Sequence, residues 1–407
     1  MMGRPRDVES DVVPDNGRSQ CLPWSGLITW CAISYSCMLV IFVRVCFPDL
    51  SLLRLGLLPL FVHGNSPALF YAFSQSPRYF SNPKDVAIVA LVPFHQRRQT
   101  EILDCYLRRN LASNGGFLNQ VVFIPQTNHT ESLGWLASTV DRESSYTASE
   151  NSDRSFDTVD KKLDTLFIWI DGDVVFLEDH TIPTMVKTKL NHPDSLIVSA
   201  NVINQAALEN LHSHPSIALP YRPELQPTQS VDHESWRASA LPHWKGPAGF
   251  RVHKGFSPPF KHHRWLPSDY EEFDYTPIGM SIYSDDGPGL GDWTVKAQQH
   301  YSFLHHLDLG DLHRYKFPMW TNPRESVSTN LLCFMSRDAK LVRSLIQHNG
   351  THGIAPNPLA NEGHTTKDII IDGKGLAAHY ISDRGLEDLD DTDVLRRYQS
   401  YAREMVC

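Results

Sequence analysis

The 407-residue sequence lacks the features that define several protein classes. It contains no sustained heptad, no Gly-X-Y run and no fixed internal period, which excludes a coiled coil, a collagen and a repeat solenoid. Positive charge is also scarce, because 37 Lys and Arg stand against 46 Asp and Glu and leave a net charge of −9. No long basic run offsets this balance, so nucleic acid is not expected as a partner. Cysteines number only 7, and none form the Cys-X-X-Cys pattern of a zinc site.

The rest of the composition, with 41% hydrophobic and 20% charged residues, is that of an ordinary globular protein. A long hydrophobic stretch lies near the amino terminus, where residues 27–43 carry no charge. As a helix it falls just short of a bilayer's hydrocarbon core, about 30 Å thick, and residues 44–47 would complete the crossing. Because no small-X-small cleavage site follows, we expect an uncleaved signal anchor rather than a cleaved signal peptide. A buried core helix is the alternative interpretation.

We therefore expect a single-pass membrane protein with a short cytosolic tail and a lumenal globular domain. The predicted parts are a tail (1–26), a transmembrane signal anchor (27–47), a stem (48–84) and a lumenal domain (85–407). Asn128 and Asn349 each begin an Asn-X-Thr sequence, which is glycosylated only in the lumen. Downstream of the anchor, Cys105, Cys333 and Cys407 allow one disulfide, and its pairing stays open.

Hydrophobic patterns in the lumenal part predict an α/β fold. The continuous apolar run at 86–92 predicts a strand that is covered on both faces. A helical pattern from Thr100 to the glycines at 115–116 and a strand at 120–124 follow, which favours a parallel βαβ unit. Further strands are predicted at 166–170 and 195–200, and helices at 181–190, 292–307, 338–348 and 391–405. The sequence indicates a polar surface loop at 142–162 and an irregular region at 215–291.

The strongest local signal for chemistry is Asp171-Gly172-Asp173, directly after the strand predicted at 166–170. Open α/β sheets bind ligands at the carboxyl ends of their strands. Side chains two residues apart in an extended chain point the same way, so both carboxylates can face one site. Two such oxygen donors suit Mg²⁺ or Mn²⁺ that carries a diphosphate. The alternative is a surface turn with two solvated carboxylates.

Three segments together resemble the GT-A class of nucleotide-sugar glycosyltransferases, specifically fungal-type, single-pass (type II) proteins of the secretory pathway. They are VAIVALVPFHQRR (86–98), FIWIDGDVVFLED (167–179) and IVSANVINQ (197–205). The resemblance covers residues 86–205. It implies a Rossmann-like sheet, mixed and mostly parallel, with a nucleotide-binding half (85–205) and an irregular acceptor half (206–407). It also implies a location in the Golgi or endoplasmic reticulum.

The resemblance further implies a metal site and a nucleotide site. Asp171 and Asp173 would hold Mn²⁺ or Mg²⁺, and Asp171 also the donor's diphosphate, with His379 as a third metal ligand. A packed structural histidine is the alternative for His379. His95, Arg97 and Arg98 follow the first strand, where the nucleotide would lie, and arginine can bind phosphate with two hydrogen bonds. A solvated helix start is the alternative for these residues.

An inverting transferase also needs a carboxylate that takes the proton of the acceptor hydroxyl. Asp286 and Asp292, in a Gly-rich segment before the helix at 292–307, are the candidates. Asp292 can instead serve as the N-cap of that helix.

The expected function is therefore metal-dependent transfer of a sugar from a UDP- or GDP-sugar to an acceptor hydroxyl. The acceptor, whether a glycan, a protein or a small metabolite, stays open. Two other functions stay open as alternatives. The Asp171 segment also resembles the nucleophile loop of haloacid-dehalogenase-like, Mg²⁺-dependent phosphatases, although two earlier strands precede it. The other is a non-catalytic membrane protein that binds glycans or scaffolds a transferase complex.

Overall fold

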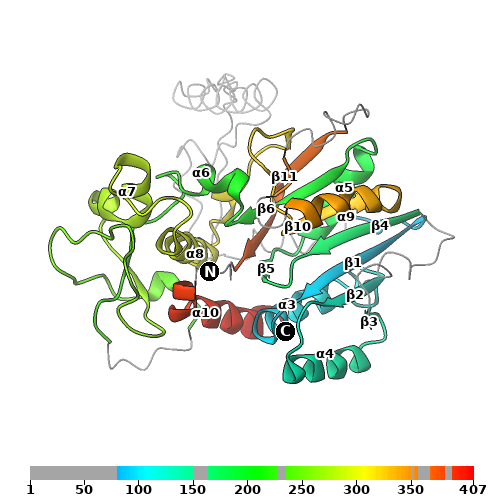
Figure 1. Ribbon diagram of the computed structural model, residues 1–407, viewed down its shortest axis with the longest axis horizontal. Coiled ribbons are helices and arrows are strands. Elements are labelled where there is room, and N and C mark those ends of the chain that lie inside the picture. The colour runs from blue at the N-terminus through cyan, green and yellow to red at the C-terminus, as the bar shows by residue number, and fades with distance from the viewer. Residues whose placement is uncertain (1–79, 150–163, 228–234, 350–352, 356–366, 381–386) are drawn as a thin grey trace, which may run out of the picture. The chain divides into compact units, whose positions relative to one another are not determined.

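The computed structural model in Figure 1 describes residues 80–149, 164–227, 235–349, 353–355, 367–380 and 387–407. The chain divides into two units, Met1–Ser66 and Pro67–Cys407, and every described residue belongs to the second. The anchor predicted at 27–47 and most of the predicted stem lie outside the described residues. Across the ranges given above, no helix has the length and apolar character needed to cross a membrane.

A mixed sheet of nine strands forms the centre of the second unit, counted over the described ranges. Its strands are β1 (Val86–Phe94), β2 (Gln120–Pro125), β3 (Tyr146–Ala148), β4 (Asp164–Ile170), β5 (Val174–Leu177), β6 (Ile197–Ile203), β9 (Trp320–Thr321), β10 (Leu331–Met335) and β11 (Ile369–His379). They are arranged in the order β3-β2-β1-β4-β10-β6-β11-β5, and β9 pairs with β11. Only β5, β9 and β10 run against the others. The predicted fold class, an α/β fold with a mixed and mostly parallel sheet, is confirmed.

Helices cover both faces of this sheet (Figure 1). The α-helices of the described ranges are α3 (Arg97–Arg109), α4 (Thr130–Arg142), α5 (Thr181–Asn191), α6 (Glu209–His212), α7 (Pro277–Tyr283), α8 (Trp293–Leu309), α9 (Ala339–Asn349) and α10 (Val394–Tyr401). Of these, α7 packs on α8 rather than on the sheet. Alternate residues of β1 pack into two separate hydrophobic clusters. Ile88 and Val92 join the cluster that includes residues of α3, α5, α8 and α10, whereas Val89 and Leu91 join the one that includes Val342 of α9. This burial on both faces explains the unbroken apolar run of β1.

The sheet differs from the sequence-based prediction at several strands, and β5 and β9 are among those that the prediction missed. Residues 146–148, predicted as loop, form the short edge strand β3, which pairs in parallel with β2 and buries Tyr146 against Phe123. The prediction also missed β10, which lies antiparallel between β4 and β6. Strand β10 carries a five-residue apolar run. A run this short does not distinguish a strand from a buried helix segment, so its pairing with β4 and β6 is what identifies it as a strand.

The region predicted to be irregular, 215–291, contains little regular structure where it is described. Within this region, β7 (Tyr221–Pro223) pairs with β8 (Trp265–Pro267) in a two-stranded sheet. Beside this sheet, Arg264 donates two hydrogen bonds to the Glu224 carboxylate, at 2.9 and 2.6 Å, and both side chains are buried. Three of its tryptophans, Trp236, Trp244 and Trp265, are buried and supply local core.

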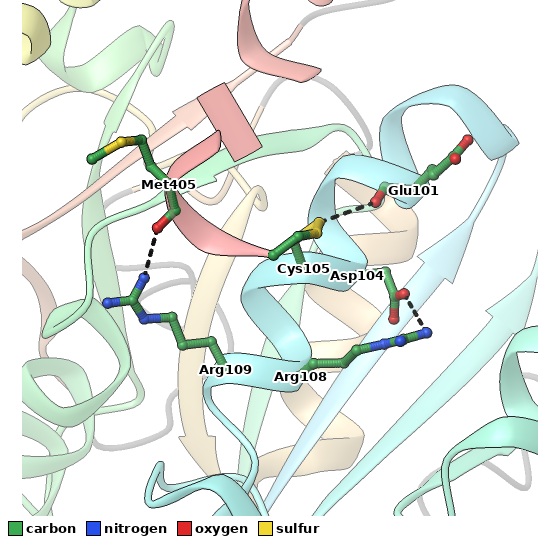
Figure 2. Close-up of a disulfide and its surroundings, with 7 residues drawn as sticks. Glu101, Asp104, Cys105, Arg108, Arg109 and Met405 are labelled. Carbon is green, nitrogen blue, oxygen red and sulfur yellow. Dashed lines mark hydrogen bonds and ion pairs between the residues drawn. A yellow bond between two sulfur atoms is a disulfide. The ribbon is translucent and has the colours of Figure 1, made fainter. Parts of the chain in front are cut away.

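A disulfide joins Cys105 of α3 to Cys407, 302 positions later in the chain. Figure 2 shows it where the carboxyl-terminal turn meets α3. Nearby, Arg109 Nη1 donates to the main-chain oxygen of Met405 at 3.2 Å. Cys333 is a free, buried thiol in β10. The pairing that the sequence left open is therefore between Cys105 and Cys407.

Removal of this disulfide is expected to destabilise the protein substantially. A cross-link across so long a loop restricts the unfolded chain strongly, so Cys105→Ser with Cys407→Ser should lower the free energy of unfolding by about 2–5 kcal/mol. Urea unfolding of the full-length protein measures this change. As the control, a reductant should lower the free energy of unfolding of the wild type to that of the double variant. The same reductant should leave the double variant unchanged. Equal unfolding midpoints for wild type and double variant would contradict the prediction.

Candidate metal centre

Strand β4 delivers Asp171 and Asp173 to the carboxyl edge of the sheet. The segment leaves the extended conformation directly after Ile170 and forms a turn. In that turn the main-chain N–H of Asp173 donates to Asp171 Oδ1 at 3.1 Å, as in an Asx-turn. The sequence analysis expected the two carboxylates to face one site because side chains alternate along an extended chain. That reason was wrong, because a turn brings the two carboxylates together.

Strand β11 brings His379 to the same edge. Because β10 is antiparallel to both β4 and β6, and β11 is parallel to β6, the carboxyl ends of β4, β6 and β11 lie on one side. The pairing of β11 with β5 shifts register between Ala378 and His379, and such irregularities re-aim side chains. The main-chain N–H of Tyr380 then donates to the carbonyl oxygen of Asp173 at 2.8 Å. This bond connects the end of β11 directly to the Asp171–Asp173 turn.

Asp171, Asp173 and His379 form a compact cluster. One ligand atom from each lies within 4.8 Å of the other two, and His379 Nε2 is 3.7 Å from Asp171 Oδ2. Asp173 and His379 are buried, and Asp171 is partly exposed. The sequence-based hypothesis required His379 to fold back beside Asp173, and the structure places it there.

The electrostatics of the cluster favour an ionised Asp171. Burial on its own would raise the pKa of this carboxyl group. The hydrogen bond and charge of His379, the amide of Asp173 and the charge of His95 outweigh burial and hold the pKa of Asp171 below its ordinary value. The site therefore presents negative charge at neutral pH.

The donor set fits a divalent metal ion. Two carboxylates are the ligands that Mg²⁺ and Mn²⁺ prefer, and a neutral imidazole favours Mn²⁺ over Mg²⁺. Such ions take more than three ligands, so oxygen atoms of water or of a further ligand would complete the coordination. Asp171, Asp173 and His379 are thus the residues that would hold the metal.

Gly172 is required by packing rather than by a ligand. A Cβ atom at this position would lie 2.4 Å from the carbonyl oxygen of Pro93 in β1, which is too close for any side chain. The glycine therefore lets the Asp171–Asp173 turn pack directly on the end of β1. This close approach is the structural reason for glycine at the middle position of the motif.

Gly172→Ala is expected to displace the turn and weaken Mn²⁺ binding. Because the clash is with backbone, we expect a loss of about 1–3 kcal/mol in the free energy of unfolding, as for other overpacked sites. Thermal unfolding and a Mn²⁺ titration measure the two effects. Gly134→Ala, in α4, is the matched control, since an added Cβ there meets nothing within 4 Å. Wild-type Mn²⁺ affinity in Gly172→Ala would show that the turn tolerates the methyl group.

The three residues after β1 that were predicted to bind the nucleotide have different neighbours. His95 is exposed and close enough to Asp171 for its charge to lower the pKa of that carboxyl group. Arg97 instead pairs with Glu101 and Glu131, at 3.7 and 3.5 Å. Arg98 is exposed, and its charge acts on Tyr380, next to His379. The structure thus places His95 close to Asp171 and Arg98 close to Tyr380, and turns Arg97 toward α4.

The two predicted bases lie between α7 and α8. Asp292 is the N-cap of α8, where its Oδ1 accepts hydrogen bonds from the main-chain N–H and the hydroxyl of Thr294, at 2.9 and 2.7 Å. Asp286 is exposed in the preceding turn. The capping alternative for Asp292 is therefore what the structure shows for its carboxylate.

Sequence reasoning missed a group of buried polar residues behind His379: Asn204, His300 and Tyr398. Asn204 follows the last residue of β6, and an asparagine at the carboxyl end of a buried strand was a signal that could have been used. From the sequence alone, His300, His305 and His306 of α8 are expected on a partly exposed helix face rather than at a metal, because no Glu in HExxH spacing accompanies them. That expectation was wrong for His300 and His306, which are 0% and 4% exposed, because elements from both sides pack around α8.

Comparison with known proteins assigns no family to the chain. No family model matches it, and no curated protein matches it. Among solved structures, the crystal structure of S. aureus TarS 1–349 is similar at 12% sequence identity, with a TM-score of 0.23. The match covers 37% of this chain and 45% of that one, so it spans less than half of the matched structure. A similarity this low carries no functional argument.

Proposed function

We propose that this protein is a metal-dependent glycosyltransferase that moves a sugar from a nucleotide-sugar donor to an acceptor hydroxyl. The observation that carries the proposal is the cluster of Asp171, Asp173 and His379 at the carboxyl edge of the sheet. Two carboxylates and an imidazole in one turn-and-strand arrangement match the ligand set implied by the resemblance to GT-A enzymes.

The place of the cluster in the sheet supports the same proposal. Strand β1 has β2 on one side and β4 on the other, so the strand order reverses at β1. Ligands of open α/β sheets bind outside the carboxyl ends of strands at such a reversal. The Asp171–Asp173 turn packs on the end of β1, and α3 begins three residues after that strand. A nucleoside diphosphate bound at this edge would meet the metal ligands and the exposed side chains of His95 and Arg98.

The roles of the residues follow from their chemistry. A bound divalent ion would supply charge neutralisation for the diphosphate leaving group. Asp171, Asp173 and His379 hold that ion, and His95 and Arg98 offer hydrogen-bond donors to phosphate oxygens. Asp286 is the candidate base that the proposal retains, because the carboxylate of Asp292 is engaged in capping α8. The donor is a UDP- or GDP-sugar, and the acceptor is a glycan, a protein or a small metabolite.

The proposal places the catalytic unit in the lumen of the Golgi or endoplasmic reticulum, behind the anchor predicted at 27–47. The disulfide between Cys105 and Cys407 supports this setting, since stable disulfides form mainly in oxidising compartments. A carboxyl terminus that is accessible to protease from the cytosol would contradict it.

Turnover assays with the full-length protein test the proposed reaction. Mn²⁺-dependent release of UDP or GDP from a panel of nucleotide sugars would support a transferase. A phosphoryl group trapped covalently on Asp171 would instead establish the phosphatase alternative. Glycan binding without turnover of any donor would establish the non-catalytic alternative.

A further inference from the structure

Behind His379, a chain of hydrogen bonds crosses from the end of β6 to α10. Asn204 Nδ2 lies 3.2 Å from the carbonyl oxygen of His379 and 2.7 Å from Nε2 of His300. The other ring nitrogen of His300, Nδ1, lies 2.9 Å from the hydroxyl group of Tyr398. Asn204, His300 and Tyr398 are at most 3% exposed, so water does not compete for these contacts.

Only one arrangement of protons satisfies these contacts. A carbonyl oxygen can only accept, so the Asn204 atom that faces His379 is the amide nitrogen. The second hydrogen of that amide points to His300 Nε2, which must then be the unprotonated ring nitrogen. The proton of the neutral ring is therefore on Nδ1 and is donated to the oxygen of Tyr398. Burial lowers the pKa of His300 to about 3, with the charges of His379 and Lys296 acting in the same direction, which keeps the ring neutral.

The backbone explains why a side chain is needed here. The ladder between β6 and β11 ends at the pair Ile203–Ala378. The next residue, Asn204, has a φ of 69°, in the left-handed region, so its main chain has left the strand. The side-chain amide of Asn204 thus supplies the donor to His379 that the next ladder position would otherwise supply. Asparagine tolerates left-handed backbone better than most residues, although glycine tolerates it best.

We propose that Asn204, His300 and Tyr398 are positioning residues for the metal centre, which hold the main chain of His379 so that its imidazole faces Asp171 and Asp173. The inference rests on the proposed metal site and adds three residues that act on it through His379. Outer-shell partners of this kind orient metal ligands, and losing one typically costs about 10–100-fold in metal affinity.

Asn204→Gly tests whether the Asn204 side chain positions His379 or whether Asn204 only provides a left-handed turn. Glycine keeps the left-handed backbone and removes the side chain with its amide, so we expect Mn²⁺ affinity to fall about 10–100-fold. The loss of the free-ion signal in electron paramagnetic resonance, measured as Mn²⁺ is titrated into full-length protein, gives the affinity directly. If Asn204→Gly binds Mn²⁺ as tightly as the wild type, Asn204 serves the turn alone and the inference is overturned.

The chain offers a matched control in Asn322→Gly. Asn322 also has left-handed backbone, with a φ of 50°, but it hydrogen-bonds to Ile369 at the start of β11 rather than at its end. The same substitution there should leave Mn²⁺ affinity unchanged. An equal loss of affinity in both variants would show that loosening β11 anywhere weakens the site, which would contradict a specific role for Asn204.

Tyr398→Phe tests the far end of this chain of hydrogen bonds by removing only the hydroxyl oxygen. Without an acceptor, the His300 proton is expected to move from Nδ1 to Nε2, which turns the Asn204 amide away from His379. We expect weaker Mn²⁺ binding and a tautomer change in the ¹⁵N spectrum of labelled histidine. His300→Gln should retain more affinity than His300→Phe, because its amide oxygen can accept from Asn204.

Two outcomes distinguish this inference from the proposed function. A wild type that binds no Mn²⁺ overturns both. The second outcome is that the wild type binds Mn²⁺ and Tyr398→Phe keeps both the wild-type affinity and the wild-type tautomer of His300. This outcome overturns the positioning role and leaves the metal site in place.

Discussion

Asp173→Asn is expected to abolish Mn²⁺ binding, and with it the Mn²⁺-dependent binding of UDP- or GDP-sugars. The substitution keeps the shape of the side chain but removes the negative charge and a hard oxygen donor. Because Asp173 would bind the ion directly in the proposed site, the loss of affinity should exceed the roughly 100-fold upper range for outer-shell partners. Titration of Mn²⁺ followed by electron paramagnetic resonance, with and without nucleotide, measures it.

The fold should survive this change. An asparagine at Asp173 retains its main-chain bonds to Asp171 and Tyr380, so thermal unfolding should stay close to that of the wild type. Asp171→Asn should behave alike, because an amide oxygen can still accept from the N–H of Asp173. Asp141→Asn, on the exposed face of α4, is the matched control and should bind Mn²⁺ normally. Normal Mn²⁺ affinity in Asp173→Asn would show that the turn is only structural.

His379→Ala is expected to weaken Mn²⁺ binding by about 100-fold, because a ligand matters at least as much as its outer-shell partners. Nucleotide binding at saturating Mn²⁺ should change less, since both carboxylates remain. Isothermal titration of Mn²⁺ into the full-length protein, followed by titration of UDP and GDP, separates the two effects. His253→Ala, at an exposed histidine, is the control.

The pH dependence of His379→Ala provides a second readout. An imidazole must be neutral to bind a metal, so wild-type Mn²⁺ affinity should fall as the pH drops below about 6.5, the ordinary pKa of histidine. The variant has lost this competition and should show a flatter profile there. Its affinity should fall only at lower pH, where carboxyl groups take up protons. Parallel pH profiles for the two proteins would exclude His379 as a ligand.

The location of the acidic motif could be predicted from the sequence because its signal is local. An apolar run followed at once by Asp171 and Asp173 predicted a buried strand end, and β4 ends at Ile170. The N-cap alternative for Asp292 rested equally on local pattern, and the structure shows that cap. In each case the residues concerned are neighbours in the chain, so a short window contains the whole signal.

The neighbours of the motif could not be predicted in this way. His379 reaches Asp171 only because β11 pairs with β6 and β5, and the sequence suggested it through resemblance alone. Asn204, His300 and Tyr398 come from three elements whose order in space no local pattern contains. The histidines of α8 were misplaced for the same reason, since a helix packed on several sides shows no clear apolar stripe.

By itself the sequence predicted several of the buried strands and helices, the position of the acidic turn, and the availability of one disulfide. The tertiary structure alone decided the strand order, the insertion of β10 between β4 and β6, the pairing of Cys105 with Cys407 and the polar network behind His379. The physical reason is that hydrophobic periodicity reports burial one element at a time. Which elements meet depends instead on contacts between residues far apart in the chain, such as the 302 positions between the paired cysteines.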